Sequence, residues 1–411
     1  MRGKSAQARV SWSYLLLMAE VSSSLALSYR SLSTEMTVPI LCADSAAGLS
    51  EAGAGMVVPD GDGRSLTFFE TTFNFSTRLQ LWQDAGAGTP PTTTLATHDQ
   101  PPAAFVAFVK PHLVEFPSLD GRHMIHGQYF ATGVDGADGG TLGGAAAIFT
   151  HGGSQRQMYG ALHYASVYAN LYATCQQLAL AGIPTLSINY RSGVGYSRDF
   201  RLCGPPLDPP NGPQTRRCGP RGALEYDDVR AGRAWLDKQL APDRVGIFGL
   251  SYGGLNCLQA LSRDPIDYAA GVCNAPVFNW VSQMRFDGAT LFDPAPRLYP
   301  SYRQLPVGPE PLEAGPRWSA RARNLSALAF ASSPVAHVSS IRGPLLLIHG
   351  DLDEEVAYQE SLDLARFLRA KGVPTDTLFF PDECHGECAY ANQLVAMNAT
   401  VSFLTSHLLH V

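Results

Sequence analysis

The stretch RVGIFGLSYGG, residues 244–254, decides the fold of this chain. Its first part, Arg244–Phe248, is an apolar strand candidate, and a helix-like run follows the final glycines. A G-x-S-x-G pattern between a strand and a helix is typical of a nucleophile elbow, a tight turn that exposes the serine hydroxyl. Gly249 and Gly253 have no side chains that would collide within such a turn. The pattern therefore predicts that Ser251 is a nucleophile at the end of a strand.

Outward from this turn, short apolar segments alternate with helix-length segments from about residue 111 to residue 411. The strand candidates are His112–Phe116, His126–Ala131, Ala145–Thr150, Pro184–Tyr190, Arg244–Phe248, Ala269–Cys273, Pro344–His349 and Asp376–Phe380. The helix candidates are Ala161–Ala181, Leu224–Leu240, Tyr252–Ser262, Val356–Lys371 and Asn392–His410. This alternation predicts an α/β protein of the α/β-hydrolase type, with an eight-stranded, mostly parallel sheet and helices on both faces. The turn Ser118–Gly121 predicts a hairpin, so that the sheet begins antiparallel.

The segment before this domain is β-rich. Within residues 35–110, strand candidates lie at Ser65–Phe69 and Leu79–Trp82, and the segment is too short for a closed propeller of several blades. Residues 1–34 carry several basic residues and serines but only one acid, Glu20, which indicates a leader or a disordered N-terminus. A transit peptide fits this composition better than a secretory signal, which favours a cytoplasmic or organellar location over secretion.

A serine hydroxyl needs a base to remove its proton, and histidine suits that role at neutral pH. In this fold the acid and then the histidine follow the serine in chain order. His385 lies in the loop after the last strand candidate, at the sheet edge where α/β proteins build their sites. His349 ends the preceding strand candidate and is assigned to its turn. The other histidines after Ser251, which have no comparable placement, are His337, His407 and His410.

The orienting acid is expected in the loop after the strand Pro344–His349. That loop, Asp351–Glu355, contains four acids, and Asp353 is the best candidate. Spacing alone does not separate Asp351 from Asp353. The remaining acids are interpreted as solvated carboxylates of the loop.

Eight cysteines are spread along the chain, and an even count in a long chain does not establish disulfides. Cys203 and Cys218 flank a Pro/Gly-rich loop and are expected to pair only in an oxidising compartment. We interpret three cysteines as small, buried apolar residues, namely Cys175, Cys257 and Cys273. A metal site built from Cys384, His385 and Cys388 is not expected, because the spacing is awkward and no second cluster accompanies it.

The overall composition limits the kinds of partner that this chain is expected to bind. A net charge of -6 gives no electrostatic reason to bind nucleic acid, and no apolar run reaches the 18 residues that a membrane-spanning helix needs. The predicted chemistry needs neither a metal nor an organic cofactor. The expected partner is a peptide or acyl-peptide substrate, and homo-oligomerisation is left open.

Several motifs occur in a characteristic order. They are His151–Gly153, Asn189–Tyr196, Gly249–Gly254, Ser333–Pro334, His349–Asp353 and His385–Gly386. With them, residues 111–411 resemble the catalytic domain of the prolyl oligopeptidase family of serine peptidases. The acylaminoacyl-peptidase and dipeptidyl-peptidase-like branches are the most similar. The resemblance implies a serine-type peptidase that cleaves short or N-acylated peptides.

The resemblance also implies residue roles. Asp353, the second aspartate of its motif, becomes the catalytic acid, and Asp351 becomes a supporting residue of the loop. The amide of Tyr252 and that of Gly153, with Gly152 as the alternative, become the oxyanion hole, in which preorganised donors stabilise the developing charge. Family members carry an N-terminal β-propeller, and residues 35–110 resemble a short remnant of one.

Two features differ from the dipeptidyl-peptidase branch. The chain keeps Ala275–Val277 and Trp280, but Gln283 and Asp287 stand where that branch has tyrosines. A strict dipeptidyl-peptidase is therefore not expected. Trp280, Met284 and Phe286 are interpreted in one of two ways. They line an apolar specificity pocket, or they only pack beneath this region.

Two other functions remain open from the sequence. A carboxylic-ester hydrolase would use the same three catalytic residues, because the triad serves both kinds of bond. A non-catalytic binding protein on a hydrolase scaffold is the second alternative. The presence of all three of Ser251, Asp353 and His385 argues against it.

Overall fold

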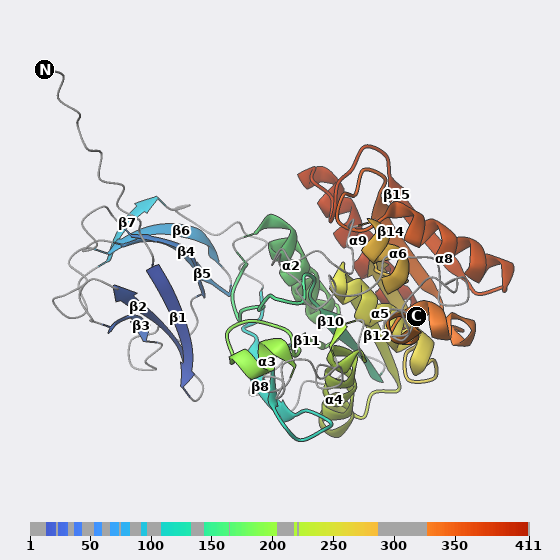
Figure 1. Cartoon of the computed structure of the whole chain (residues 1–411), viewed down its shortest axis with the longest axis horizontal. Coiled ribbons are helices and arrows are strands. Elements are labelled where there is room, and N and C mark those ends of the chain that lie inside the picture. Colours follow the sequence, from blue (N-terminus) through green and yellow to red (C-terminus); the bar gives the residue numbers. More distant parts are fainter. Residues whose placement is uncertain are drawn as a thin grey trace, which may run out of the picture. The chain divides into compact units, whose positions relative to one another are not determined.

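The computed structural model describes the chain in separate stretches. Side chains are described for residues 73 and 81 and for 108–132, 144–163, 165–203, 218–219, 222–283 and 327–409. The backbone is also described for residues 284–286 and for seven strands before residue 97. The chain divides into two compact units, residues 1–72 with 76–100, and residues 73–75 with 101–411 (Figure 1).

The first unit contains two sheets. Their strands are β1 (Tyr14–Val21), β2 (Ser24–Ser31) and β3 (Thr37–Cys42), then β4 (Gly53–Pro59), β5 (Leu66–Thr72), β6 (Phe75–Trp82) and β7 (Thr92–Ala96). β5 and β6 confirm the two strands predicted from the sequence. β1 and β2 fall within residues 1–34, where the composition indicated a leader or a disordered N-terminus. The domain boundaries and the relation to a propeller remain predictions.

The second unit is built on an eight-stranded sheet in the order β15-β14-β13-β12-β10-β11-β9-β8. Its strands are β8 (His112–Pro117), β9 (Met124–Phe130), β10 (Ala145–Thr150), β11 (Thr185–Asn189), β12 (Arg244–Leu250), β13 (Ala270–Asn274), β14 (Leu345–Gly350) and β15 (Thr375–Phe380). β8, β9 and β11 pair antiparallel, and all pairs from β11 to β15 are parallel. This confirms the predicted mostly parallel sheet that begins with a hairpin.

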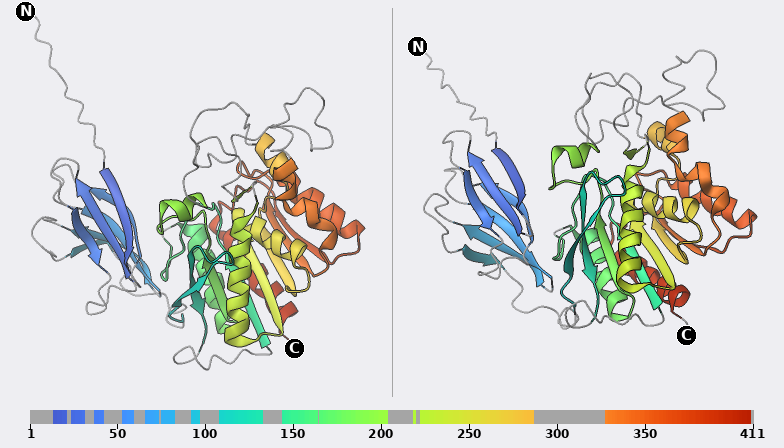
Figure 2. Two further views of the ribbon diagram at one scale, coloured as in Figure 1. Left: turned by 60° about the horizontal axis from the view of Figure 1, so that its bottom comes forward. Right: turned by 90° about the horizontal axis from the view of Figure 1, so that it is seen from below.

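Helices cover both faces of this sheet (Figure 2). One face carries α2 (Ser166–Leu180) and α9 (Tyr390–Leu408), and the other carries α4 (Leu224–Leu240), α5 (Tyr252–Arg263) and α8 (Tyr358–Ala370). Successive residues of a strand point to opposite faces, so Ile148 of β10 packs with the second set and Phe149 with the first. Among the helices of the described residues, none combines the length and apolar character needed to cross a membrane.

The described parts of the connections contain the short helices α3 (Arg198–Leu202), α6 (Trp280–Phe286) and the 3-10 helix η5 (Pro334–Ser340). The connection after α6 lies outside the described residues up to residue 326. The parallel strands β10 to β15 all end at the same edge of the sheet, and ligands of open α/β sheets bind at that edge.

Three disulfides join cysteines of the second unit, and they are Cys203–Cys218, Cys257–Cys273 and Cys384–Cys388. Their Cα–Cα separations of 5.8, 5.9 and 5.5 Å lie within the usual range for disulfides. The interpretation of Cys257 and Cys273 as unpaired hydrophobes is wrong, because α5 packs on β13 and brings the two together. Cys175 is free and buried, as predicted.

Candidate active site

Ser251 stands at the junction of β12 and α5, in a strained backbone conformation. Its φ of 61° and ψ of −119° place it in the positive-φ region that residues with side chains rarely adopt. The turn is held from both sides, because the Ser251 N–H donates to the Asn274 carbonyl oxygen at 2.8 Å and its own carbonyl accepts from Leu255 at 2.9 Å. A strained serine between a strand and a helix is the geometry of a nucleophile elbow.

The glycines of the elbow are needed because backbone from β10 passes close to them. A methyl group at Gly249 would lie 2.6 Å from the carbonyl oxygens of both Gly253 and Thr150. A methyl group at Gly253 would collide with the Thr150 carbonyl oxygen and lie 2.7 Å from that of His151. These distances confirm the sequence argument that only glycine fits either position.

The loop His151–Gly153, which follows β10, lies directly against the nucleophile. A methyl group at Gly152 would be 3.1 Å from the Ser251 Cβ, and Gly153 has a φ of +61°. The ring of His151 stacks on Tyr190 with centroids 4.4 Å apart, and the Tyr190 hydroxyl donates to the His151 carbonyl oxygen. Burial lowers the pKa of His151 to about 3, so its imidazole is neutral at pH 7. The loop is thus anchored and uncharged.

Asp353 and His385 form the hydrogen bond expected between acid and base. The distance from His385 Nδ1 to Asp353 Oδ2 is 2.7 Å. The other oxygen, Oδ1, accepts the amides of Glu355 at 2.8 Å and Val356 at 2.9 Å. Burial alone would raise the pKa of Asp353. The hydrogen bonds from His349 and His385, with the positive charge that His385 carries when protonated, outweigh burial and hold that pKa well below its usual range. The carboxylate is therefore ionised.

Asp351 has a different role. It is exposed, and its Oδ1 accepts the Asp382 N–H at 2.7 Å, so it links the loop after β14 to the loop after β15. This contact separates the two aspartates that spacing left open, because Asp353 and not Asp351 contacts the His385 imidazole.

His349 contacts the Asp353 carboxylate, which the sequence argument did not foresee. Its Nε2 lies 3.1 Å from Asp353 Oδ2, and its Nδ1 lies 2.7 Å from the Ser361 hydroxyl. The ring is completely buried. When Nε2 carries the proton, Nδ1 accepts from Ser361, and His349 holds the same oxygen that orients His385. Nothing in the local sequence marks this contact, because it depends on the path of the loop after β14.

The structure also brings the His385 loop to the elbow. A methyl group at Gly386 would lie 3.1 Å from the Leu250 side chain, next to Ser251. Both Ser251 and His385 are described, and no hydrogen bond joins the Ser251 hydroxyl to the His385 imidazole. Catalytic hydrogen bonds are often long when no substrate is bound. Ser251 and the hydrogen-bonded pair of His385 and Asp353 thus lie on adjoining segments.

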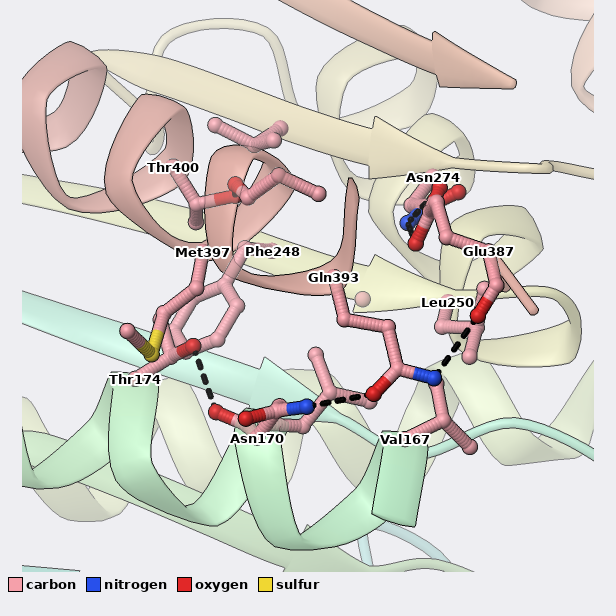
Figure 3. A pocket seen from close by; sticks show the side chains of 14 residues that line it. Val167, Asn170, Thr174, Phe248, Leu250, Asn274, Glu387, Gln393, Met397 and Thr400 are labelled. Atoms are coloured by element: carbon pink, nitrogen blue, oxygen red, sulfur yellow. Dashed lines mark hydrogen bonds between the residues drawn. The ribbon is translucent and has the colours of Figure 1, made fainter. Parts of the chain in front are cut away.

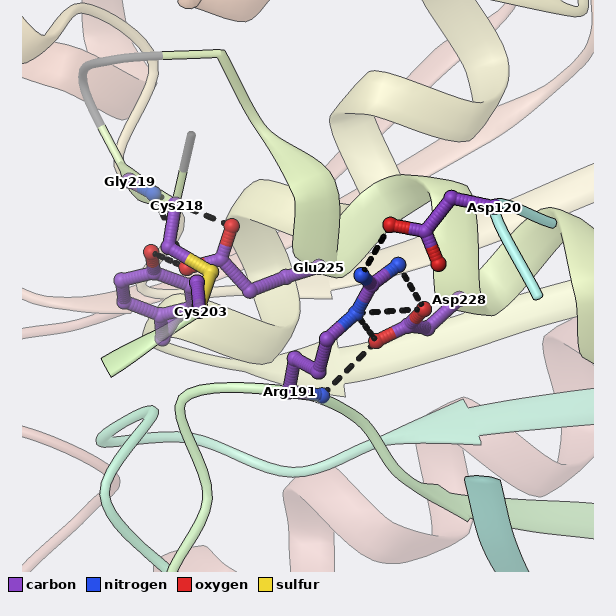
Figure 4. The surroundings of a disulfide bond; sticks show 8 residues. Asp120, Arg191, Cys203, Cys218, Gly219, Glu225 and Asp228 are labelled. Atoms are coloured by element: carbon purple, nitrogen blue, oxygen red, sulfur yellow. Dashed lines mark hydrogen bonds and ion pairs between the residues drawn. A yellow bond between two sulfur atoms is a disulfide. The ribbon is translucent and has the colours of Figure 1, made fainter. Parts of the chain in front are cut away.

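Hydrogen bonds and an ion pair hold the residues beside the elbow. The Tyr252 hydroxyl donates to the Glu225 carboxylate at 2.5 Å, and Glu225 also accepts the Gly219 amide at 2.9 Å beside the Cys203–Cys218 disulfide (Figure 4). Burial raises the pKa of Glu225 to about 7. Next to this group, Arg191 of the predicted Asn189–Tyr196 motif forms a buried ion pair with Asp228.

The three predicted pocket residues are placed only in part. Trp280 is 2% exposed and packs against Tyr252, with ring centroids 5.6 Å apart. This contact makes Trp280 part of the core beside the elbow. The side chains of Met284 and Phe286 lie outside the described residues, so the specificity pocket remains a prediction.

In the described part of the chain, two groups of cysteines and a glutamate have the spacing of metal ligands, but their cysteines are not free to bind a metal. The two groups with suitable spacing are Cys203, Cys218 and Glu225, and Glu383, Cys384 and Cys388. In each, both cysteines are joined in a disulfide. A metal needs free thiolates, which these pairs do not supply.

Comparison with known proteins agrees with this geometry. Residues 219–410 match the model of the prolyl oligopeptidase family. The dipeptidyl aminopeptidase BIII of Pseudoxanthomonas mexicana is 29% identical over 234 residues, which cover 56% of this chain and 30% of that protein. The acylamino-acid-releasing enzyme of Sus scrofa is 24% identical over 239 residues, covering 56% and 28%. The match therefore spans less than a third of the length of these relatives.

Solved structures share the fold. The acylaminoacyl peptidase of Pyrococcus horikoshii superposes with a TM-score of 0.69 at 20% identity, covering 97% of this chain and 55% of that one. A puromycin hydrolase superposes with a TM-score of 0.66 at 18% identity, covering 93% and 50%. Sheet order, elbow and helices thus define an α/β-hydrolase. Within that class, residues 219–410 are similar to the prolyl oligopeptidase family of peptidases.

Proposed function

We propose that this protein is a serine-type peptidase that hydrolyses peptide bonds of short or N-acylated peptides. The observation that carries the proposal is the Asp353–His385 hydrogen bond of 2.7 Å on a loop that adjoins the Ser251 elbow. The match to a peptidase family supports the choice of peptide bonds. Relatives named as an acylamino-acid-releasing enzyme and a dipeptidyl aminopeptidase support short substrates.

In the proposed mechanism, Ser251 Oγ attacks the scissile carbonyl while His385 Nε2 takes its proton. Asp353 accepts from His385 Nδ1 and stabilises the imidazolium that forms. The amides of Tyr252 and Gly153 donate to the oxyanion. His385 then returns the proton to the leaving amine, and an acyl-enzyme on Ser251 remains. Water, activated by the same imidazole, releases the acid and restores the serine.

Gly153 is favoured over Gly152 as the second oxyanion donor. A methyl group at Gly152 would lie 2.6 Å from the buried Tyr168 hydroxyl and 2.7 Å from the Leu250 carbonyl oxygen, so Gly152 is enclosed by the protein. Gly153 has the positive φ that turns the chain sharply after β10, beside the nucleophile.

The test is hydrolysis of chromogenic peptide anilides in matched pairs, N-acetylated and with a free amine, by the wild type and by Ser251→Ala. The proposal predicts anilide hydrolysis by the wild type and a loss of at least about 1,000-fold in Ser251→Ala. Matching esters are measured in parallel. Hydrolysis of esters without any of the anilides would favour a carboxylic-ester hydrolase, and hydrolysis of neither would contradict the proposal.

A further inference from the structure

Asn274, the last residue of β13, contacts both halves of the candidate active site. Its carbonyl oxygen accepts the Ser251 N–H at 2.8 Å, which holds the elbow. Its side-chain Nδ2 donates to both carboxylate oxygens of Glu387, at 3.1 and 3.2 Å (Figure 3). Glu387 follows His385 by two residues. One asparagine therefore joins the turn of the nucleophile to the loop of the base.

Glu387 is held firmly in its place. It has a φ of +57° and is 3% exposed. From α9, Gln393 donates to the Glu387 carbonyl oxygen at 2.7 Å, and Asn170 of α2 donates to Gln393 at 2.6 Å. The carboxylate lines a small cavity of about 30 Å³ between these helices and the sheet, which Leu250 also lines. Main chain and side chain of Glu387 are thus fixed by different elements.

Packing alone does not account for a carboxylate at this position. Burial raises the pKa of Glu387 to about 7, against the opposing effects of the Asn274 hydrogen bond and the charge on His385. The titratable groups that act on it are His385, Glu383 and Asp353, and the contacts from α9 and β13 are neutral amides. A leucine would fill a similar volume without the cost of burying an ionisable group.

We infer that Asn274 and Glu387 are positioning residues that set the His385 imidazole against the Ser251 hydroxyl, an inference that rests on the proposed function. The hydroxyl and the imidazole do not hold each other in the described structure, so their approach depends on how the two segments are placed. The Asn274–Glu387 hydrogen bond is a side-chain link between those segments. A displacement of about 1 Å at reacting atoms costs on the order of 100-fold in rate.

Four variants test the link. Glu387→Leu removes the acceptor, and Asn274→Asp places two carboxylates in one buried contact. The double variant Asn274→Asp/Glu387→Gln restores the hydrogen bond with donor and acceptor exchanged. Met397→Leu is the matched control, because Met397 lines the same cavity and makes no contact in the link. The measurements are kcat and KM on a cleaved anilide, the rate of labelling by a fluorophosphonate, and the melting temperature.

For Glu387→Leu and Asn274→Asp we expect kcat and the labelling rate to fall about 10- to 100-fold, with KM within about threefold of the wild type. The exchanged double variant should recover both to within about threefold, and Met397→Leu should match the wild type. The melting temperature of Glu387→Leu reflects two opposing effects, because the buried carboxylate is gone and the buried Asn274 amide loses its acceptor. If the contact were purely structural, its loss would change the melting temperature and leave kcat unchanged.

Unchanged kcat and labelling rate in Glu387→Leu would overturn the inference, even if Asn274→Asp does not fold. An exchanged double variant no faster than Asn274→Asp would overturn it as well. A wild type that is labelled at Ser251 but cleaves no peptide contradicts the proposed function alone, because the labelling rates still measure the link. A wild type that is not labelled contradicts both.

Discussion

The Asp353 carboxylate accepts hydrogen bonds on both oxygens, two from amides of its own loop and two from histidines. Asp353→Asn keeps the shape but replaces one acceptor with a donor, which would favour the wrong tautomer of His385. We expect kcat/KM to fall on the order of 10,000-fold with the fold unchanged. Steady-state kinetics beside circular dichroism check this. A loss under tenfold would show that Asp353 is not the catalytic acid.

His349 donates to the same Asp353 oxygen as His385. We expect His349→Ala to lower kcat by roughly tenfold, because an outer partner that orients a catalytic group has an effect of this size. It should also lower the free energy of unfolding by about 1–3 kcal/mol, because the buried Ser361 hydroxyl loses its partner. Kinetics and urea titration measure the two losses. A stability loss with an unchanged kcat would limit His349 to a structural role.

Single residues show where the sequence argument ends. The placement of Ser251 at a strand-to-helix turn and of His385 in the loop after β15 was predictable, because the elbow has a local motif and chain order excludes most histidines. Asp353 was separated from Asp351 only by the family resemblance, and the structure adds the physical reason that Asp351 binds the Asp382 amide. His349 was assigned to a turn, because its contact with Asp353 arises from loop geometry that no periodicity encodes.

The loop between β15 and α9 is closed by the Cys384–Cys388 disulfide, which brackets His385. We expect Cys384→Ser/Cys388→Ser to lower kcat several-fold with little change in melting temperature, because a closed loop this short removes little chain entropy. The matched control is Cys257→Ala/Cys273→Ala. It opens a longer loop away from His385 and should lower stability by about 3 kcal/mol with kcat retained.

Kinetics and thermal melting of the two pairs of variants distinguish these effects. If the pair at residues 384 and 388 lowered only the melting temperature, the disulfide would not help to place the imidazole.

The elements themselves were largely predictable. All eight strands of the large sheet lie where segments of strand length were predicted. The inner strands β10 to β14 are buried on both faces, which makes their segments easy to recognise. Helix ends were less predictable. α8 begins at Tyr358 rather than Val356, because the Asp353 side chain accepts the Val356 amide and holds it in the turn. The pairing of Cys257 with Cys273 depends on helix–strand packing, which spacing does not reveal.

Stability of the second unit should depend on pH through buried ionisable groups. Burial raises the pKa values of Glu225, Glu360 and Glu387 to about 7. A carboxyl with a raised folded pKa contributes stability that is complete below its unfolded pKa of about 4.5 and is lost as pH rises through 7. Burial lowers the pKa values of His151 and His163 to about 3 and 4. They act oppositely, because their contribution is present above about pH 6.5 and is lost as pH falls toward 4.

Glu360→Gln isolates one of these contributions. The Glu360 Oε2 accepts the amides of Phe278 at 2.9 Å and Asn279 at 2.7 Å, and a glutamine oxygen can accept both. Relative to the wild type, we expect the variant to gain about 3 kcal/mol of stability between pH 4.5 and pH 7.5. Urea unfolding at several pH values measures the gain. A difference that does not change with pH would contradict a raised pKa at Glu360.

Across the whole chain, prediction was best where periodicity is strong. The sheet and its covering helices follow from alternation over residues 111–411, whereas β1 and β2 lie where composition indicated a leader. In β1, YLLLMAEV, apolar residues do not alternate with polar ones, so no strand period marks it. The matched part of the chain spans about 30% of the length of the curated relatives.

Mapping of a covalent fluorophosphonate adduct by tandem mass spectrometry decides whether Ser251 is the activated nucleophile. On the native chain, a single adduct is expected on the peptide that contains Ser251. Labelling should be reduced at least about 1,000-fold in His385→Ala, because the hydroxyl then lacks its base. An adduct on another residue, or equal labelling of Ser251 in His385→Ala, would contradict the triad of Ser251, His385 and Asp353.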